Sequence, residues 1–186
     1  MNPTTKAALM DMSPRAGTDP TASATAETAT TRAEETAAVG DRLTLEQART
    51  VLAAQPFARH VGTEITEFEG GSATLVTELH PEHAQQFGFV HGGVLAYLAD
   101  NALTFAAGSA LGPNVLTGGF SITYLRPARG ERLRARAAVT DATRRQAVAR
   151  CEIYCDGPDS STLCAVAQGT VRTVDRALPA AESQPG

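Results

Sequence analysis

The chain has 186 residues, of which 42% are hydrophobic, and its formal net charge is −4. This length allows one domain with a packed core, and the acidic balance is unlike the basic surfaces that bind nucleic acid or anionic membranes. The three cysteines lack zinc-site spacing, and an odd number makes a poor disulfide framework. We therefore expect buried thiols, a cytoplasmic location, no metal and no cofactor.

The two ends of the chain differ in composition from its middle. Residues 1–43 are rich in Ala, Thr, Ser, Glu and Pro, and residues 176–186 again lack a run of large apolar side chains. Such segments bury too little apolar surface to offset the entropy lost on ordering. The sequence therefore predicts a disordered N-terminal tail over 1–43, one domain over 44–175 and a flexible C-terminal tail over 176–186. The start of the chain does not resemble a signal peptide.

The domain is expected to begin with a helix and a hairpin. Thr44 starts a capping-box pattern, and apolar residues then recur at helical spacing, which predicts a helix over 45–54 that ends at Pro56. Strand patterns follow over 61–68 and 72–79. A glycine pair separates them, so the two strands are expected to form a β-hairpin.

A long apolar helix and more strands complete the predicted domain. The helix is expected over 93–111, after a loop over 80–90 and before a Gly-Pro pair that stops it. Short connections between the strands that follow predict an antiparallel meander. One sheet with one helix packed across it is an α+β arrangement. The four later strands are expected over 115–125, 132–141, 146–155 and 162–174.

The predicted long helix carries an acid at its centre, Asp100, although it is apolar on nearly all sides and should be buried. Asp100 shares a stripe of the helical wheel with Thr104 and Ala107. The acid makes a membrane span costly, and a buried charge needs a partner, yet no Lys or Arg lies within 92–111. Asp100 is therefore a structural acid paired with an arginine such as Arg126, a hydrogen-bonded core group, or a functional carboxylate.

The tripeptide His91-Gly92-Gly93 opens the same helix. Glycines allow close approach to the backbone, and the first amides of a helix lack intrahelical partners and carry partial positive charge. Taken alone, the tripeptide is also compatible with a tight turn and a structural histidine. Together with Asp100 it offers a carboxylate and an oxyanion-binding helix end, without a GxSxG serine. A thioester suits this set because its thiolate leaves without strong acid assistance.

The run from His91 to Ala102 resembles the HGGxxxxLxD signature of phenylacetate-pathway-type (PaaI-like) thioesterases of the hotdog superfamily. The segment 121–130, SITYLRPARG, is similar to that family's strand ending in an RPA..G turn. The resemblance covers residues 57–174. It implies a hotdog fold, in which an antiparallel β-sheet wraps around one long central α-helix, and hydrolysis of an aryl- or medium-chain acyl-CoA to the free acid and CoA.

The resemblance also implies roles for individual residues. Asp100, nine positions after His91, would be the nucleophile or general base, and the Gly92 amide would polarise the thioester carbonyl. Gln85 would orient the carbonyl or the water, Thr104 would hold the water, and His91 would be a positioning residue. Such enzymes act as homodimers or homotetramers. Each active site lies at a subunit interface and combines the Gln85 side of one subunit with the acid-bearing helix of another.

Candidate contacts to the CoA part of the substrate are Gly93, Arg126, Arg129 and Arg144. Guanidinium groups suit phosphates, although these arginines are equally compatible with a solvated surface. Two other functions stay open. One is a non-catalytic hotdog module that only binds acyl-CoA. The other is a hotdog enoyl-CoA hydratase or dehydratase, which would need a catalytic histidine paired with an acid.

Overall fold

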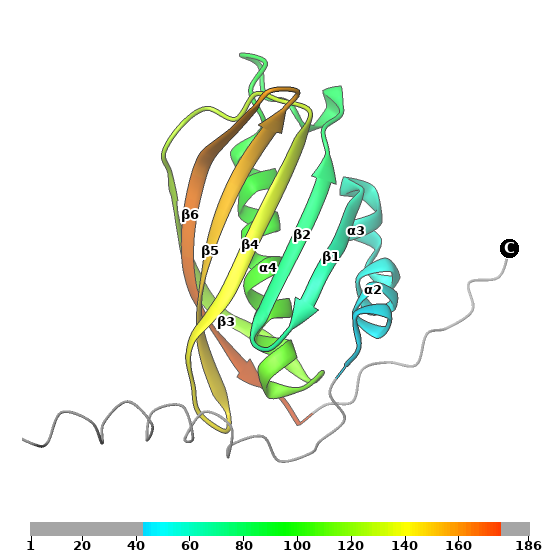
Figure 1. The fold of residues 1–186 in the computed structure, drawn as a ribbon, viewed down its shortest axis with the longest axis vertical. Helices are drawn as coiled ribbons and strands as arrows, with labels where there is room; N and C mark the ends of the chain where they lie inside the picture. Colours follow the sequence, from blue (N-terminus) through cyan, green and yellow to red (C-terminus); the bar gives the residue numbers. More distant parts are fainter. Residues whose placement is uncertain (1–42, 176–186) are drawn as a thin grey trace, which may run out of the picture. The chain divides into compact units, whose positions relative to one another are not determined.

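The structure, a computed structural model, describes residues 43–175. Apart from Leu43, the predicted tails over 1–43 and 176–186 lie outside the described residues. The described part forms one six-stranded antiparallel sheet with the order β1-β2-β4-β5-β6-β3, crossed on one face by a long helix (Figure 1). The helices are α2 (Leu45–Ala54), α3 (Pro56–Val61) and α4 (Gly92–Leu111), and the strands are β1 (Thr63–Glu69), β2 (Ser72–Glu78), β3 (Val115–Tyr124), β4 (Arg132–Ala142), β5 (Gln146–Gly157) and β6 (Ser160–Thr173).

The first helix has the predicted cap but is followed by a helix that the sequence analysis missed. The Thr44 hydroxyl accepts a hydrogen bond from the Gln47 amide at 3.2 Å, and the Gln47 side-chain oxygen accepts one from the Thr44 amide at 2.8 Å. Pro56 was expected only to end α2. It is instead the first residue of α3, where a missing amide hydrogen costs nothing. Gly62, with a φ of 71°, ends α3 in the left-handed conformation, so β1 begins at residue 63 rather than 61.

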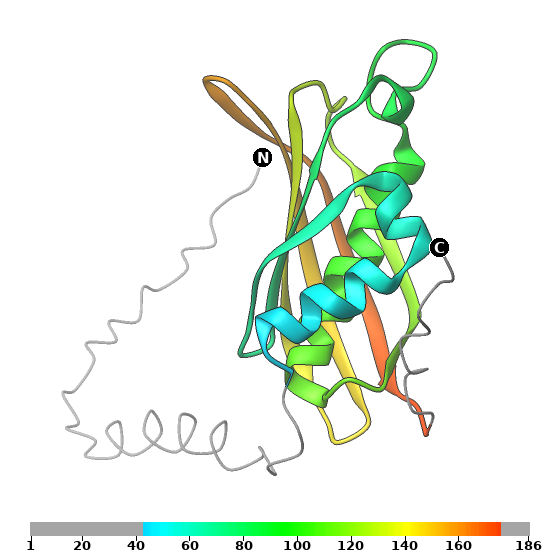
Figure 2. The same cartoon turned by 90° about the vertical axis from the view of Figure 1, so that its right-hand side faces the viewer.

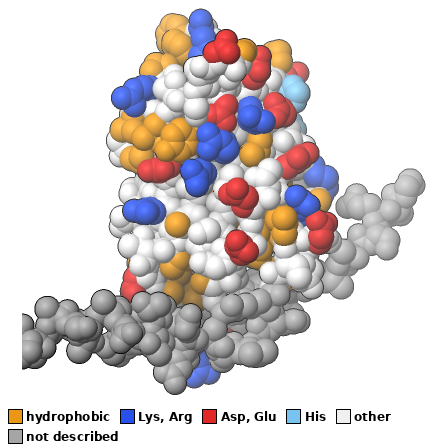
Figure 3. Space-filling view, viewed as in Figure 1, with side chains coloured by type: hydrophobic (Ala, Val, Ile, Leu, Met, Phe, Trp, Pro, Cys, Tyr) orange, Lys and Arg blue, Asp and Glu red, His pale blue; other side chains and the backbone are white. Residues whose placement is uncertain are grey.

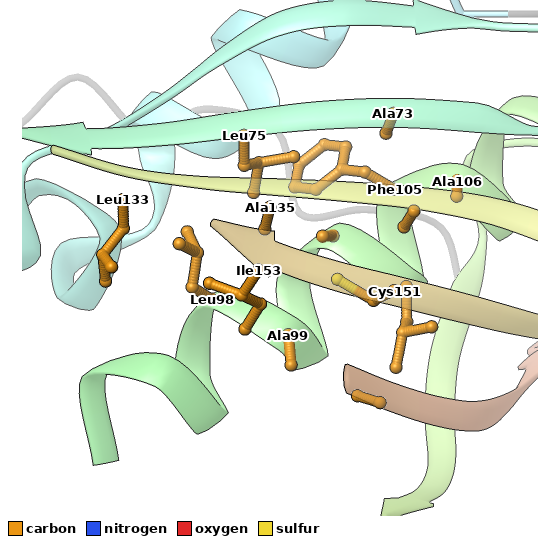
Figure 4. Close-up of a cluster of buried hydrophobic side chains, with 14 of the residues drawn as sticks. Ala73, Leu75, Leu98, Ala99, Phe105, Ala106, Leu133, Ala135, Cys151 and Ile153 are labelled. Atoms are coloured by element: carbon orange, nitrogen blue, oxygen red, sulfur yellow. The ribbon is translucent and has the colours of Figure 1, made fainter. Parts of the chain in front are cut away.

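The core lies between α4 and the sheet, and α2 and α3 lie on the same side of the sheet as α4 (Figure 2). Small side chains on α4 let the helix approach the strands closely, and larger ones such as Leu98 and Leu103 are fully buried. Figure 4 shows Leu98, Ala99 and Phe105 of α4 against side chains of β2, β4 and β5. Each fully buried leucine stabilises the fold by about 1.5–3 kcal/mol, so this layer holds α4 in place.

Of the described helices, only α4 has the length and hydropathy needed to cross a membrane, and 56% of its most apolar window is buried inside the fold. The buried thiols Cys151 and Cys155 line the same core from β5. Burial raises the pKa of Cys151 to about 12 and that of Cys155 to about 11. Both sulfurs therefore stay protonated and poorly nucleophilic near neutral pH.

The position of β3 differs from the predicted meander. Strands β4, β5 and β6 are consecutive neighbours as expected, but β3 pairs with β6 and not with β4. The connection over 125–131 has seven residues and spans up to about 23 Å. Three strand spacings amount to only about 14 Å. A short connection therefore does not force β3 and β4 to pair, and β3 lies at an edge of the sheet.

One residue of β3 is extra in its pairing with β6. The register shifts between Thr117 and Gly119, so Gly118 forms a β-bulge. Thr117 faces Val171 across the ladder, and Tyr124 faces Ala165. Both partners are buried on the sheet face that packs against α4. Thr117 and Tyr124 are seven residues apart and would point to opposite faces of a regular strand. The bulge turns both toward α4.

The other face of the sheet carries interspersed basic and acidic side chains (Figure 3). The buried carboxylate there is Asp156, which accepts two hydrogen bonds from the Arg134 guanidinium at 2.9 and 3.1 Å and one from Ser161. The Arg134 hydrogen bond is the main reason that the pKa of Asp156 lies below its ordinary value. A Cβ at Gly130 would lie 2.6 Å from the Asp156 carbonyl oxygen, which explains the glycine in the RPA..G turn.

Candidate active site

The first turn of α4 leaves one amide without an acceptor. The His91 amide donates to the His83 carbonyl at 2.8 Å, the Gly93 amide donates to His91 Nδ1 at 2.9 Å, and the Val94 amide donates to the His91 carbonyl at 3.0 Å. The Gly92 amide, between them, makes no hydrogen bond to any described residue. His91 therefore caps the helix, and the Gly92 N–H is the donor at this helix end that is free for a ligand.

The loop before α4 fixes the orientation of Gln85. The Gln85 amide donates to the Phe89 carbonyl at 2.8 Å, and the Gly88 amide donates to the Gln85 carbonyl at 2.9 Å. The side-chain oxygen Oε1 of Gln85 accepts a hydrogen bond from the Phe87 amide at 2.6 Å. Because the loop occupies the carbonyl end of this side chain, its NH₂ group is left to donate.

Gln85 and Gly92 line one groove of about 380 Å³ at the start of α4. Among the described residues no carboxylate lines the groove, and the Gly92 N–H and the Gln85 amide group are both hydrogen-bond donors. This end of the helix therefore suits an oxygen that carries partial negative charge. The lining residues are Gln85, Phe89, Val90, Gly92, Leu95, Tyr124, Leu125, Arg126, Pro127 and Ala128.

The residues predicted to contact CoA do not all lie near this groove. Arg126 lines it and donates a hydrogen bond to the Leu163 carbonyl at 3.1 Å. Arg129 lies beside it, with its guanidinium carbon 5.0 Å from the centre of the Phe89 ring. Gly93 donates its amide to His91. Arg144 lies in the β4–β5 turn, about 30 Å along β4 from the groove end, so it does not approach the groove of its own chain.

Asp100 lies farther along α4, and its hydrogen-bond partner among the described residues is a hydroxyl group of β3. Thr117 Oγ1 of β3 donates to Asp100 Oδ1 at 2.7 Å, and Thr104 Oγ1 lies 2.7 Å from Thr117 Oγ1. Among the described residues no Lys or Arg forms an ion pair with Asp100, and Arg126 bonds elsewhere. The predicted alternative of an arginine partner is therefore wrong. Asp100 is a half-buried carboxylate held by a hydrogen bond from Thr117.

The three side chains define a direction for the hydroxyl protons. Thr117 has one hydroxyl proton and donates it to Asp100, so the proton between the two threonines must come from Thr104. Thr104 then presents only lone pairs to its surroundings. Asp100 Oδ2 makes no hydrogen bond to any described residue. A water molecule that donates to Thr104 Oγ1 and to Asp100 Oδ2 would satisfy both groups.

The structure does not bring all the predicted site residues together in one chain. Gln85 and Gly92 share the groove, whereas Asp100 and Thr104 form a second group. Asp100 follows Gly92 by eight residues, which is about 12 Å along a helix axis. Reacting atoms must approach to about 3–3.5 Å. One thioester carbonyl therefore cannot reach the donors of the groove and the carboxylate of the same chain.

Two residues in contact with the predicted site, Thr117 and Tyr124, were not found from the sequence. Thr117 bonds Asp100, and the Tyr124 hydroxyl donates to the Gly92 carbonyl at 2.9 Å. A glycine pair inside a strand pattern indicates a bulge, and bulges re-aim side chains, often beside active sites. Gly118-Gly119 was therefore the signal that could have directed attention to β3. Within residues 43–175, no group of His, Cys, Asp and Glu side chains has an arrangement that would hold a metal ion.

Comparisons with known proteins fit this geometry. The family model described as Thioesterase superfamily matches residues 87–162. A thioesterase family protein from Silicibacter pomeroyi is 30% identical to this chain, with a TM-score of 0.65, and the match covers 68% of this chain and 94% of that protein. The chain belongs to the thioesterase superfamily. Two further similarities, to PaaI of Thermus thermophilus and to a hydrolase of Listeria monocytogenes, support this assignment.

Those two similarities differ in extent. A mutant form of the phenylacetic acid degradation protein PaaI from Thermus thermophilus is 30% identical to this thioesterase-superfamily chain, with a TM-score of 0.57, over 64% of this chain and 100% of that one. A 1,4-dihydroxy-2-naphthoyl-CoA hydrolase from Listeria monocytogenes is 34% identical over 62 residues, 33% of this chain and 50% of that protein. The match thus spans half the length of this curated relative. The predicted PaaI-like hotdog fold is confirmed.

Proposed function

We propose that this thioesterase-superfamily protein hydrolyses the thioester of an aryl- or medium-chain acyl-CoA, giving the free acid and CoA. The observation that carries the proposal is the pairing of two complementary groups on α4. Free donors lie at its first turn, and a carboxylate with one oxygen free of hydrogen bonds lies two turns later. The similarity to a named CoA hydrolase supports the choice of CoA as the carrier of the acyl group.

The groove supplies the electrophilic half of the reaction. The Gly92 N–H and the Gln85 NH₂ would both donate to the thioester carbonyl oxygen. Negative charge grows on that oxygen as the carbon becomes tetrahedral, so these bonds strengthen toward the transition state. The donors are already oriented, Gly92 by the helix start and Gln85 by the Phe87 amide. Stabilisation of this kind typically contributes about a hundredfold per donor.

The carboxylate supplies the other half. As a general base, Asp100 Oδ2 takes a proton from a water molecule that also donates to Thr104, and the water oxygen bonds to the carbonyl carbon. As a nucleophile, Oδ2 itself bonds to that carbon, and water then cleaves the resulting anhydride. In both routes the C–S bond breaks, the sulfur leaves as the CoA thiolate and later takes up a proton. The thiolate is stable enough that no strong acid is needed near the sulfur.

A working site requires a second copy of the chain, because the two halves are about 12 Å apart in one copy. We therefore place the groove of one subunit against the acid of another, at the interface of a homodimer or of a homotetramer built from such dimers. The exposed edge of β3 supports this arrangement. In the described sheet β3 has a neighbour on one side only, and Leu116 and Phe120 on it are 62% and 38% exposed. An unpaired, apolar edge is a liability that association removes.

Arg126 and Arg129 would meet the phosphates of CoA at the mouth of the groove. Both are exposed and lie beside the lining. A guanidinium group binds phosphate oxygens through paired donors. A phosphate contact from Arg144 would have to reach the groove of another copy.

The test of both the activity and the shared site uses two inactive variants. Gln85→Glu keeps an oxygen to accept from the Phe87 amide but replaces the donor with a negative charge, and Asp100→Asn removes the base. Each subunit carries a different affinity tag, and the mixed dimer is purified and assayed on a panel of acyl-CoA substrates. One of its two sites is intact, so about half of the wild-type activity per dimer is expected.

The controls separate the two claims. A dimer with Asp100→Asn in both differently tagged subunits should stay inactive. A mixed dimer no more active than its parents would contradict the site shared between subunits. Binding of acyl-CoA by the wild-type protein without turnover of any member of the panel would instead overturn the thioesterase proposal and favour a binding module.

A further inference from the structure

Tyr124 is in contact with the residue that presents the free amide at the start of α4. Its hydroxyl donates a hydrogen bond to the Gly92 carbonyl at 2.9 Å. A Cβ built on Gly92 would lie 3.3 Å from both Cζ and the hydroxyl oxygen of Tyr124, so the ring already packs against the Gly92 Cα. Tyr124 thus contacts Gly92 in two ways, by a hydrogen bond to its carbonyl and by van der Waals contact with its Cα.

The contact comes from an element distant in sequence. Tyr124 is the last residue of β3, and the bulge at Gly118 turns its side chain toward α4. Its hydroxyl thus donates to the carbonyl of the first residue of α4. The ring is 51% exposed and lines the groove beside Gly92. A side chain placed only for core packing would be buried, so its exposure at the groove needs another explanation.

We infer that Tyr124 is a positioning residue for the Gly92 amide. This inference rests on the proposed thioesterase activity. Gly92 has no side chain to fix its backbone, and glycine has more conformational freedom than any other residue. The Tyr124 hydrogen bond and ring contact restrict that freedom. The Gly92 N–H is then already aimed at the carbonyl oxygen when the substrate binds, which is how oriented donors lower a barrier.

The inference distinguishes the hydroxyl of Tyr124 from its ring. Tyr124→Phe removes the hydrogen bond to the Gly92 carbonyl and keeps the ring in the groove. A hydrogen bond of this kind contributes about 1 kcal/mol, so kcat is expected to fall about fivefold. KM and the inhibition constant of CoA should stay within about twofold, since the aromatic ring that lines the groove is retained.

Tyr154→Phe is the matched control. The Tyr154 hydroxyl also makes one hydrogen bond, to Glu152 Oε2 at 3.0 Å, on the other face of the sheet and away from the groove. The same chemical change there should leave kcat unaltered. Thermal unfolding of both variants measures any general loss of stability, which a purely structural role would show without a change in kcat.

A double-mutant cycle provides the second measurement. Gly92→Ala places a methyl group against the Tyr124 ring and hydroxyl and should lower kcat on its own. If Tyr124 acts through Gly92, adding Tyr124→Phe to Gly92→Ala should cost less than Tyr124→Phe costs alone. Wild-type kcat in Tyr124→Phe, or full multiplicativity of the two effects, would overturn the inference. Absence of wild-type turnover would instead refute the proposed function beneath it.

Discussion

The first turn of α4 and its third turn belong to one helix but have opposite chemistry. At the first turn and in the loop before it, the free groups are donors, the Gly92 N–H and the Gln85 amide, in a groove that no described carboxylate lines. At the third turn the free groups are acceptors, Asp100 Oδ2 and the lone pairs of Thr104. Neither half can hydrolyse a thioester alone. Under the proposed function, the two ends of this segment are complementary half-sites, which two copies of the chain would complete.

Among substitutions in the acceptor half, which comprises Asp100, Thr104 and Thr117, replacing the carboxylate of Asp100 is expected to lower kcat most. Asp100→Asn keeps an oxygen to accept from Thr117 but cannot act as base or nucleophile. We expect kcat to fall by about a hundredfold or more, with the fold and the oligomer retained. Steady-state assays with aryl- and medium-chain acyl-CoA measure the loss, and size-exclusion chromatography checks the assembly. Asp141→Asn, an exposed acid at the far end of β4, should leave kcat unchanged. Turnover by Asp100→Asn at the wild-type rate would refute the role of Asp100.

Substitutions at the two threonines test which hydroxyl group supports Asp100. Thr117→Val removes a hydrogen bond to a carboxylate, which contributes about 1.5–3 kcal/mol, so kcat is expected to fall by about ten- to a hundredfold. Thr104→Val should lower kcat less, because Thr104 bonds to Thr117 and not to Asp100 itself. Thr117→Ser keeps the hydroxyl and should retain most of the activity. Equal kcat values for Thr117→Val and wild type would show that Asp100 needs no partner from β3.

The smallest expected effect is the pH dependence of stability at His83, in the turn before the donor half. His83 is 7% exposed, and its Nδ1 accepts from the His80 amide at 3.2 Å in the turn that leads to Gln85. Burial is the main reason that the pKa of His83 is lowered; His80 and His60 lower it further, and Glu82 opposes them. The folded state thus binds this proton less well than the unfolded chain. The stability that His83 contributes is complete above a pH of about 6.5 and is lost as the pH falls below it.

Thermal unfolding at about pH 7.5 and about pH 5.5 measures this loss. His83→Asn offers an amide oxygen in place of Nδ1 and does not titrate, so its unfolding temperature should fall less between the two pH values than that of the wild type. His60→Asn, at an exposed position of α3, removes only the smallest of the effects that lower the pKa of His83 and should change the pH dependence of unfolding much less than His83→Asn does. An equal fall in unfolding temperature for His83→Asn and wild type would show that His83 does not cause the loss of stability at low pH.

The sequence predicted the donor half better than the acceptor half. The glycines at the helix start and the spacing from His91 to Asp100 are local patterns, because consecutive residues of one helix have fixed geometry. Thr117 could not be found in this way. Its contact with Asp100 depends on β3 pairing with β6 at the sheet edge, and strand pairing is set by distant residues. The short helix α3 was missed because proline signals both the end of one helix and the start of another.

The bulge at Gly118 has a consequence for how relatives are aligned. Thr117 contacts Asp100 and Tyr124 contacts Gly92 from the same face of β3. They share this face because the bulge absorbs one step of the odd number of steps between Thr117 and Tyr124. A relative that lacks one residue between these positions would keep both side chains on the α4 face only if it also lacks the bulge, because six steps of a regular strand end on the face where they began. A one-residue gap in this strand of a relative therefore belongs at the bulge, because a gap placed elsewhere would align residues that face opposite sides of the sheet.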